Sequence, residues 1–161
     1  MNAMAAAPWL IRPFQPADQP AVRRLILEGL GEHFGAIDET RNPDLDDIAA
    51  HYIAQGHVFL VAVAGATVIG SGALIVEDAQ VGRLVRVSVA RGYRRRGLGR
   101  ALVARLIAAA RARGLRRLWM ETNDDWEPAI RLYRSCGFRE YDRRDGNLYM
   151  ALELTSSPLL P

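Results

Sequence analysis

The pattern of apolar and polar positions along the chain predicts strands first. Residues 58–63 form a continuous apolar run, which is typical of a buried strand, and residues 68–76 are expected to return beside it as a hairpin. Residues 81–89 are expected to form a central strand, because Val85, Val87 and Val89 alternate with the polar Arg86 and Ser88. Shorter strands are predicted over residues 11–14, 118–122, 139–143 and 148–154, the last two joined by a turn at Asp145-Gly146-Asn147.

Apolar residues spaced three and four positions apart predict helices between these strands. They are expected from Asp18 or Gln19 to about Leu30, over residues 45–54 and 98–113, and from the turn containing Pro128 onward. Glycines are expected to end them, namely Gly29, Gly31 and Gly35, then Gly56, Gly114 and Gly137, and Asp44 is expected to cap the second helix. Because strand 118–122 follows a helical crossover, it is expected to run parallel to its neighbour. The pattern predicts an α/β (α+β) fold.

Length and composition indicate one domain. The chain has 161 residues, half of them hydrophobic, and no apolar run of about twenty residues that would predict a membrane span. Residues 1–9 lack the charged start and apolar centre of a secretory signal. A single cysteine, Cys136, excludes an internal disulfide and a Cys-rich zinc site. We therefore expect a cytoplasmic protein without a metal, with a single domain over residues 1–161, a core over about 9–154, and loose ends at 1–8 and 155–161.

The basic residues are unevenly distributed, although the formal net charge is only +3. All 21 are arginines, twelve of them lie between Arg83 and Arg117, and no Asp or Glu occurs over residues 79–120. Such a block indicates a polyanionic partner, either nucleic acid or a nucleotide cofactor with several phosphates. The chain lacks a recognisable nucleic-acid-binding motif, and its aromatic residues are not interleaved with the arginines in sequence. These observations favour the cofactor.

The densest part of this block has the order of an anion site. The central strand leads into an Arg- and Gly-rich turn over residues 91–97, and a helix is expected to begin at Leu98. The first N–H groups of a helix have no partner within the helix, and glycines allow the backbone to approach a ligand closely. The helix dipole adds partial positive charge, so the turn is suited to a pyrophosphate.

Two motifs resemble those of one family. The turn reads Arg94-x-x-Gly97-x-Gly99, and its pattern after a strand resembles the acetyl-coenzyme A signature of the GCN5-related N-acetyltransferase (GNAT) superfamily. About thirty residues later, residues 129–138 resemble the superfamily motif Ala-Ile-x-Leu-Tyr-x-x-x-Gly-Phe. The resemblance covers residues 11–154. It implies a mixed, mostly antiparallel sheet flanked by helices, whose splayed central strands bind acetyl-CoA (coenzyme A).

The resemblance also implies roles for individual residues. The central strand would bind the pantetheine arm through its backbone at Val87, Ser88 and Val89, with the Val89 N–H as the oxyanion donor. Tyr133 would lie beside the thioester sulfur and protonate the departing thiolate. The resemblance further implies direct acetyl transfer to a primary amine in a ternary complex. It also implies a loop that would hold the pyrophosphate, in which the side chain of Arg94 would order the backbone. The cofactor-binding residues of this loop would be Arg94, Arg95, Arg96, Gly97, Leu98, Gly99 and Arg100.

One position departs from the family pattern. Members commonly carry an asparagine three residues before the motif alanine, where its amide contacts the cofactor arm, but this chain has Trp126 there. The nearest amide is Asn123, which we keep as a candidate cofactor contact. Trp126 is expected to pack, with a cover over the arm or the acceptor as the alternative. Cys136 is expected to pack rather than act as a nucleophile.

Several functional questions stay open at the sequence level. A general base is not identified, and the candidates are Glu121, Glu32, His33 and Asp38. The acidic segment 38–44 either lines the acceptor site, favouring a cationic amine, or is a solvated loop. The acceptor is an amine of a small molecule or a peptide, and a homodimer is left open. A non-catalytic acyl-CoA sensor and, less favoured, an arginine-rich nucleic-acid-binding protein are the alternatives.

Overall fold

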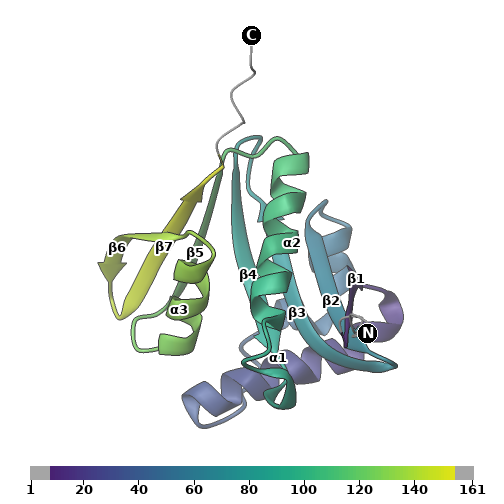
Figure 1. The fold of residues 1–161 in the computed structure, drawn as a ribbon. Coiled ribbons are helices and arrows are strands. Elements are labelled where there is room, and N and C mark those ends of the chain that lie inside the picture. The colour runs from purple at the N-terminus through teal and green to yellow at the C-terminus, as the bar shows by residue number, and fades with distance from the viewer. Residues whose placement is uncertain (1–7, 155–161) are drawn as a thin grey trace, which may run out of the picture.

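A seven-stranded sheet in the order β1-β2-β3-β4-β5-β7-β6 organises the molecule (Figure 1). The computed structural model describes residues 8–154, so the predictions for residues 1–7 and 155–161 lie outside the described residues. Neighbouring strands are antiparallel except β4 and β5, which are parallel as the helical crossover between them predicts. The strands are β1 (Leu10–Pro13), β2 (Val58–Ala64), β3 (Thr67–Val76), β4 (Val81–Val89), β5 (Arg117–Asn123), β6 (Arg139–Arg144) and β7 (Asn147–Glu153).

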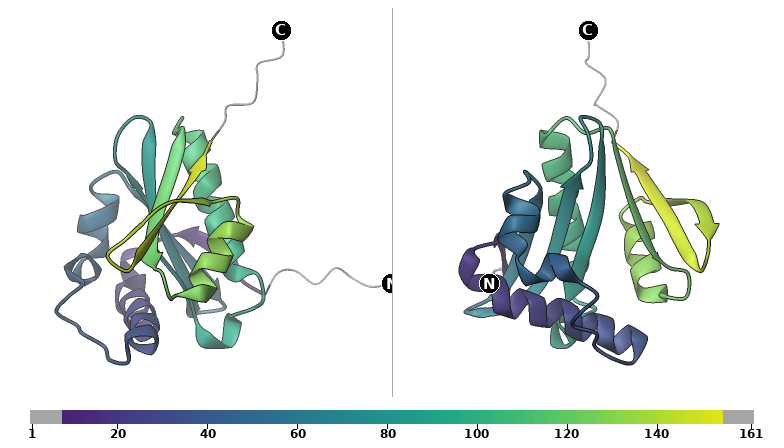
Figure 2. Two further views of the ribbon diagram at one scale, coloured as in Figure 1. Left: turned by 90° about the vertical axis from the view of Figure 1, so that its left-hand side faces the viewer. Right: turned by 180° about the vertical axis from the view of Figure 1, so that it is seen from behind.

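Helices cover both faces of the sheet (Figure 2). On one face, α1 (Gln19–Phe34) and the short turns η2 (Pro43–Asp46) and η3 (Ala49–Ile53) bury a cluster that includes Leu45, Ile48 and Phe59. On the other face, α2 (Leu98–Ala112) and α3 (Glu127–Ser135) bury a larger cluster that includes Leu102 and Leu118. Two further short turns are η1 (Pro16–Asp18) and η4 (Arg91–Tyr93).

The sheet opens between its two central strands. Pairing between β4 and β5 is confined to Val81–Arg83 and Arg117–Trp119, and below these residues the strands part, as the V between them in Figure 1 shows. This arrangement confirms the predicted mixed sheet with a splayed central pair. The splay leaves part of the backbone edge of β4 without a strand partner.

Two helix predictions were wrong in detail. Helix α1 continues through Gly29 and Gly31 and ends at Gly35, whose φ of 82° is left-handed. Inside a helix glycine costs only about 1 kcal/mol relative to alanine, and at Gly29 it permits close approach to β4, because a Cβ there would lie 3.2 Å from the Ser88 hydroxyl. In place of one α-helix over residues 45–54, the chain forms a short 3-10 helix, η2, and a short π-helix, η3. Asp44 makes no capping bond there, and its carboxylate binds Arg86 and Tyr52.

The remaining elements follow the predictions closely. The β2–β3 hairpin and β4 have the expected course, α2 is followed by the left-handed Gly114, and Pro128 lies in the first turn of α3. The β6–β7 hairpin turns at Asp145 and Gly146, which both have positive φ. No helix among residues 8–154 is long and apolar enough to cross a membrane.

Candidate active site in the cleft between the splayed strands

A cavity of about 1210 Å³ occupies the splay. Its walls come from β4, β5, α1, α3 and the loop that joins β4 to α2. The predicted residues Val87, Ser88, Val89 and Tyr133 line it together with Arg94, Arg95, Gly97, Leu98, Gly99 and Arg100. The fold therefore brings the two sequence motifs, about thirty residues apart, to one cleft.

The loop before α2 presents unpaired backbone donors. The N–H groups of residues 95–100 have no hydrogen-bond partner within the described part of the chain, and the first donor bonded into the helix is Ala101, 3.0 Å from the Gly97 oxygen. Left-handed backbone at Arg95 (φ 62°) and Gly97 (φ 85°) turns the loop into α2. Such a row of free N–H groups at a helix N-terminus fits a pyrophosphate.

Arg94 ties this loop to the rest of the cleft. Its Nε donates to the Val89 carbonyl oxygen at 3.1 Å, and its Nη1 pairs with Glu32 of α1 at 2.6 Å. The hydrogen bond from Arg94 lowers the pKa of Glu32, so this carboxylate stays charged. Arg94 is thus placed to order the loop, as the sequence predicts.

The other arginines of the basic block differ in whether they pair with a carboxylate. Within residues 8–154, Arg83, Arg86 and Arg117 each pair with a carboxylate, those of Glu121, Asp44 and Glu153. No such pair is formed by the described side chains at Arg95, Arg96 and Arg100, and the guanidinium of Arg96 lies 5.3 Å from the Tyr93 ring centre. These three arginines lie in the loop and the first turn of α2, where a polyphosphate would bind.

The free edge of β4 carries the candidate oxyanion donor. The Ala90 N–H donates to Ile69 of β3 at 2.8 Å, and backbone groups of consecutive strand residues point to opposite sides. The Val89 N–H therefore points away from β3, on the same side as its own carbonyl oxygen, which accepts the Arg94 bond. A backbone donor at this edge is fixed by the sheet and needs no rearrangement to meet a carbonyl oxygen.

A bulge in β4 reshapes this edge. The register of β3 against β4 shifts between Ser71 and Ala73, opposite Arg86, whose φ is 57°. The Ser71 hydroxyl donates to the Arg86 carbonyl oxygen at 2.8 Å and stabilises the bulge. Bulges re-aim side chains near functional sites, and here the bulge directs Arg86 toward α1 and η2.

Arg86 is the centre of a network that the sequence did not reveal. Its guanidinium binds both carboxylate oxygens of Asp44 at 2.7 and 3.0 Å, and it binds the Asn42 side chain at 3.1 Å. The Tyr52 hydroxyl donates to Asp44 at 2.6 Å. Burial alone would raise the pKa of Asp44, but the hydrogen bonds from Arg86 and Tyr52 outweigh it and lower that pKa.

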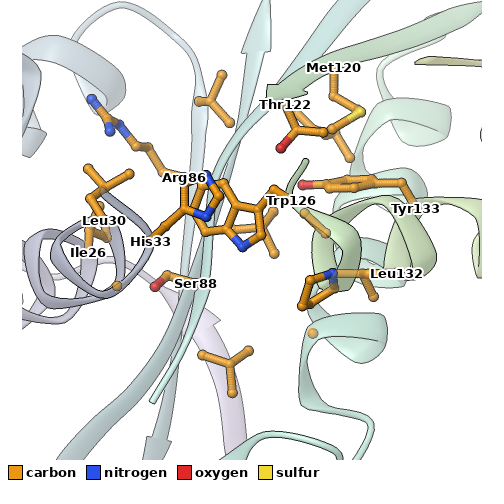
Figure 3. A pocket seen from close by; sticks show the side chains of 18 of the residues that line it. Ile26, Leu30, His33, Arg86, Ser88, Met120, Thr122, Trp126, Leu132 and Tyr133 are labelled. Atoms are coloured by element: carbon orange, nitrogen blue, oxygen red, sulfur yellow. The ribbon is translucent and has the colours of Figure 1, made fainter. Parts of the chain in front are cut away.

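Tyr133 projects from α3 into the cleft. Its side chain is only 6% exposed, its ring packs edge-on against Phe138 at 5.4 Å, and Figure 3 shows the hydroxyl directed into the cavity. Burial raises the pKa of the Tyr133 phenol, so it is protonated at neutral pH. Within the described chain the hydroxyl has no hydrogen-bond partner, and it is therefore available to donate.

The candidate bases differ in position. Glu121 lines the cavity and pairs with Arg83, Glu32 lines it and pairs with Arg94, and His33 lines it beside Trp126. Asp38 does not line the cavity, because its carboxylate turns back to Thr40 and Arg41 on the surface. No three or more His, Cys, Asp or Glu side chains within residues 8–154 are placed to hold a metal ion.

Asn123 does not occupy the position that we expected for it. It does not line the cavity, and its amide donates to the Asn147 side chain at 3.4 Å, because the β5–β7 pairing aligns these two residues. Trp126 lines the cavity instead and stacks on His33. Cys136 is half-buried and does not line the cavity, so it packs as the sequence predicts.

Comparison with known proteins agrees with this geometry. The model of the acetyltransferase (GNAT) family matches residues 21–138, and the chain therefore belongs to this family. It is 27% identical over 148 residues to the uncharacterized N-acetyltransferase YjgM of Escherichia coli K12, covering 88% of this chain and 89% of that protein. It is 37% identical over 82 residues to the E. coli K12 [ribosomal protein bS18]-alanine N-acetyltransferase, covering 45% of this chain and 55% of that protein.

Solved structures share the fold. A Staphylococcus aureus acetyltransferase of the GNAT family superposes with a TM-score of 0.84 at 24% identity, covering 91% of this chain and 99% of that one. The yncA protein of Salmonella typhimurium, whose structure contains its cofactor acetyl-CoA, superposes with a TM-score of 0.77 at 25% identity, covering 94% and 97%. The protein is an acetyl-CoA-dependent N-acetyltransferase.

Proposed function

We propose that this enzyme transfers the acetyl group directly to a primary amine, and that the amine enters from the α1 side of the cleft. The observation that carries the proposal is the convergence of three features in one cavity: the free N–H groups of residues 95–100, the Val89 N–H and the Tyr133 hydroxyl. Acetyl-CoA, when bound, supplies a thioester whose carbonyl carbon is attacked by the amine.

Each feature has a separate task. The loop N–H groups and the arginines around them bind the pyrophosphate. The Val89 N–H donates to the thioester carbonyl oxygen as negative charge develops on it. Tyr133 gives its proton to the departing thiolate, which is favourable only if the thiolate is the stronger base in the bound state. The raised pKa of Tyr133 keeps it protonated until then.

The acceptor side has a different chemical character. Glu121 and Asp44 bring carboxylates to the cavity, each paired with an arginine, and His33 and Tyr52 add further polar groups. Glu121 is the candidate base that we favour, because it lies on β5 beside the point where the strands part. It accepts the amine proton directly or through one water.

Initial-rate kinetics test direct transfer. With both substrates varied, we expect intersecting double-reciprocal lines, and intact-mass spectrometry of enzyme with acetyl-CoA alone should show no added acetyl group. Parallel lines together with a 42-dalton adduct lost in Cys136→Ala would establish a covalent route and contradict the proposal. The mass shift is that of an acetyl group replacing hydrogen, about 42 daltons.

A further inference from the structure

Two aromatic side chains from opposite faces of the sheet meet across the cleft. His33 lies in the last turn of α1, and Trp126 directly precedes α3. Their ring centres are 4.0 Å apart and their planes differ by 7°, so the rings stack face to face, as Figure 3 shows. The two residues are far apart in sequence and both line the cavity. The stack is therefore a bridge over the open part of the splay.

Neighbouring contacts support the bridge. His33 Nε2 lies 3.6 Å from the Asp125 carboxylate, next to Trp126 in sequence, so α1 meets this loop at two points. The His33 side chain is 17% exposed. Phe34 places its ring edge-on to Trp126 at 6.3 Å and is itself 60% exposed. The stack and the contacts of His33 and Phe34 therefore join the end of α1 to the loop before α3.

A second bridge crosses the splay near its apex. Arg83 of β4 pairs with Glu121 of β5, where the two strands cease to be paired. Between the two bridges the cavity is bordered by Arg86 on one strand and Thr122 on the other, as Figure 3 shows. An acceptor approaching from the α1 side meets this bounded opening.

We propose that the His33–Trp126 stack sets the width of the acceptor entrance and selects amines that are unbranched next to the nitrogen. The inference rests on the proposed function and adds the residues that determine acceptor shape. Both rings line the cavity on its α1 side, so they take up space that a bulkier acceptor would need. Removing either ring widens the opening while the loop of residues 95–100 and Tyr133 stay in place.

The test compares an unbranched with a branched acceptor. Wild type, Trp126→Ala and His33→Ala are assayed with n-butylamine and with sec-butylamine at saturating acetyl-CoA, together with Tyr141→Ala as the control. Tyr141 is an aromatic residue on β6 that is 50% exposed and does not line the cavity. We expect both stack variants to raise the kcat/KM ratio of branched to unbranched amine at least tenfold, because pocket contacts of this size discriminate about 10- to 200-fold.

The KM for acetyl-CoA separates this inference from its alternative. We expect it to change less than about threefold in Trp126→Ala, a change of well under 1 kcal/mol. An unchanged amine ratio with a strongly raised KM for acetyl-CoA would instead make Trp126 a cover for the cofactor arm and overturn the inference. A further outcome is that wild type and variants bind acetyl-CoA but acetylate neither these two amines nor any other primary amine. In that case the proposed function fails, and the inference fails with it.

Discussion

At the scale of single residues, ion pairs account for most of the charged side chains in the cleft. Arg86 is largely buried, yet its charge is matched by Asp44, which also accepts from Tyr52. A buried guanidinium without a partner would lose several kcal/mol of solvation, so Asp44 is needed for Arg86 to lie where it does. Tyr133 differs, since no described side chain satisfies its hydroxyl, and that leaves it free for chemistry.

Replacing Asp44 tests this pairing. We expect Asp44→Asn to lower the free energy of unfolding by about 2–3 kcal/mol at pH 7, because Arg86 loses its countercharge while remaining buried. The folded-state pKa of Asp44 is lowered, so its contribution is present above the unfolded pKa of about 3.9 and is lost as the pH falls through the folded value.

Urea denaturation at two pH values measures the effect. The difference between wild type and Asp44→Asn should shrink when the pH is lowered from 7 to about 3. Asp46→Asn is a suitable control, because Asp46 is in the same turn and makes only an exposed pair with Arg23. Equal stability of Asp44→Asn and wild type at pH 7 would show that the Arg86 network does not stabilise the fold.

At the scale of elements, the loop between β4 and α2 depends on backbone conformation. A Cβ at Gly97 would meet no atom within 4 Å, so lack of space within the protein does not explain why this residue is glycine. Its φ of 85° is the constraint, because a side chain costs about 1 kcal/mol or more in left-handed backbone. The loop N–H groups are aligned only while Gly97 keeps this conformation.

Alanine substitutions at Gly97 and Gly92 test whether acetyl-CoA binding depends on the left-handed backbone at Gly97. We expect Gly97→Ala to weaken acetyl-CoA binding at least tenfold in calorimetric titration, because the loop must rearrange and a Cβ would approach the bound pyrophosphate. Gly92→Ala is the matched control, since Gly92 also has open space around it but lies outside the left-handed region. If both variants bind as wild type does, residues 95–100 are not the pyrophosphate site.

The elements show what sequence patterns can and cannot predict. The apolar pattern correctly located β2, β3, β4 and α2. Strands β2 and β3 are buried over most of their length and α2 buries one face, and the apolar residues record that burial. The pattern failed at residues 45–54, where a network centred on Arg86 decides the backbone path and involves residues more than thirty positions apart. Glycines within α1 were misinterpreted because local propensity does not show a close approach to a neighbouring strand.

The same distinction applies to the candidate site. The loop and Tyr133 were predicted because short motifs carry their own local geometry. For Asn123 a cofactor contact stays a prediction: the residue does not line the cavity, and the pairing of β5 with β7 places its amide beside Asn147. The stack of Trp126 on His33 joins elements almost a hundred residues apart in the chain, and no pattern in a single sequence indicates such a contact.

At the scale of the whole molecule, the fold places several arginines against aromatic rings and carboxylates. Arg83 of β4 lies over the ring of Trp119 of β5, Arg117 of β5 lies over that of Tyr141 of β6, and Arg144 of β6 lies over that of Tyr149 of β7. Each of these arginines also has a carboxylate partner. The charges of these three arginines are therefore balanced, whereas Arg95, Arg96 and Arg100, which form no such pair among the described residues, lie at the loop before α2 and in its first turn.

The groups of the proposed mechanism come from both halves of the sheet that the splay separates. The half with β4 and α2 provides the loop and the Val89 N–H, and the half with β5 and α3 provides Tyr133 and Glu121. The central claim is that their meeting in one cleft transfers acetyl groups to amines, with Tyr133 acting on the leaving thiolate.

The most direct test compares wild type with Tyr133→Phe by two measurements on the same preparations. Calorimetry should give one acetyl-CoA site per chain with similar affinity in both, while thiol release with a panel of primary amines should be about 10²–10³-fold slower in the variant, the range of general acid catalysis. Mass spectrometry should find the acetylated amine. Equal turnover in both proteins would remove Tyr133 from the reaction, and absence of acetyl-CoA binding in wild type would contradict the account of the cleft.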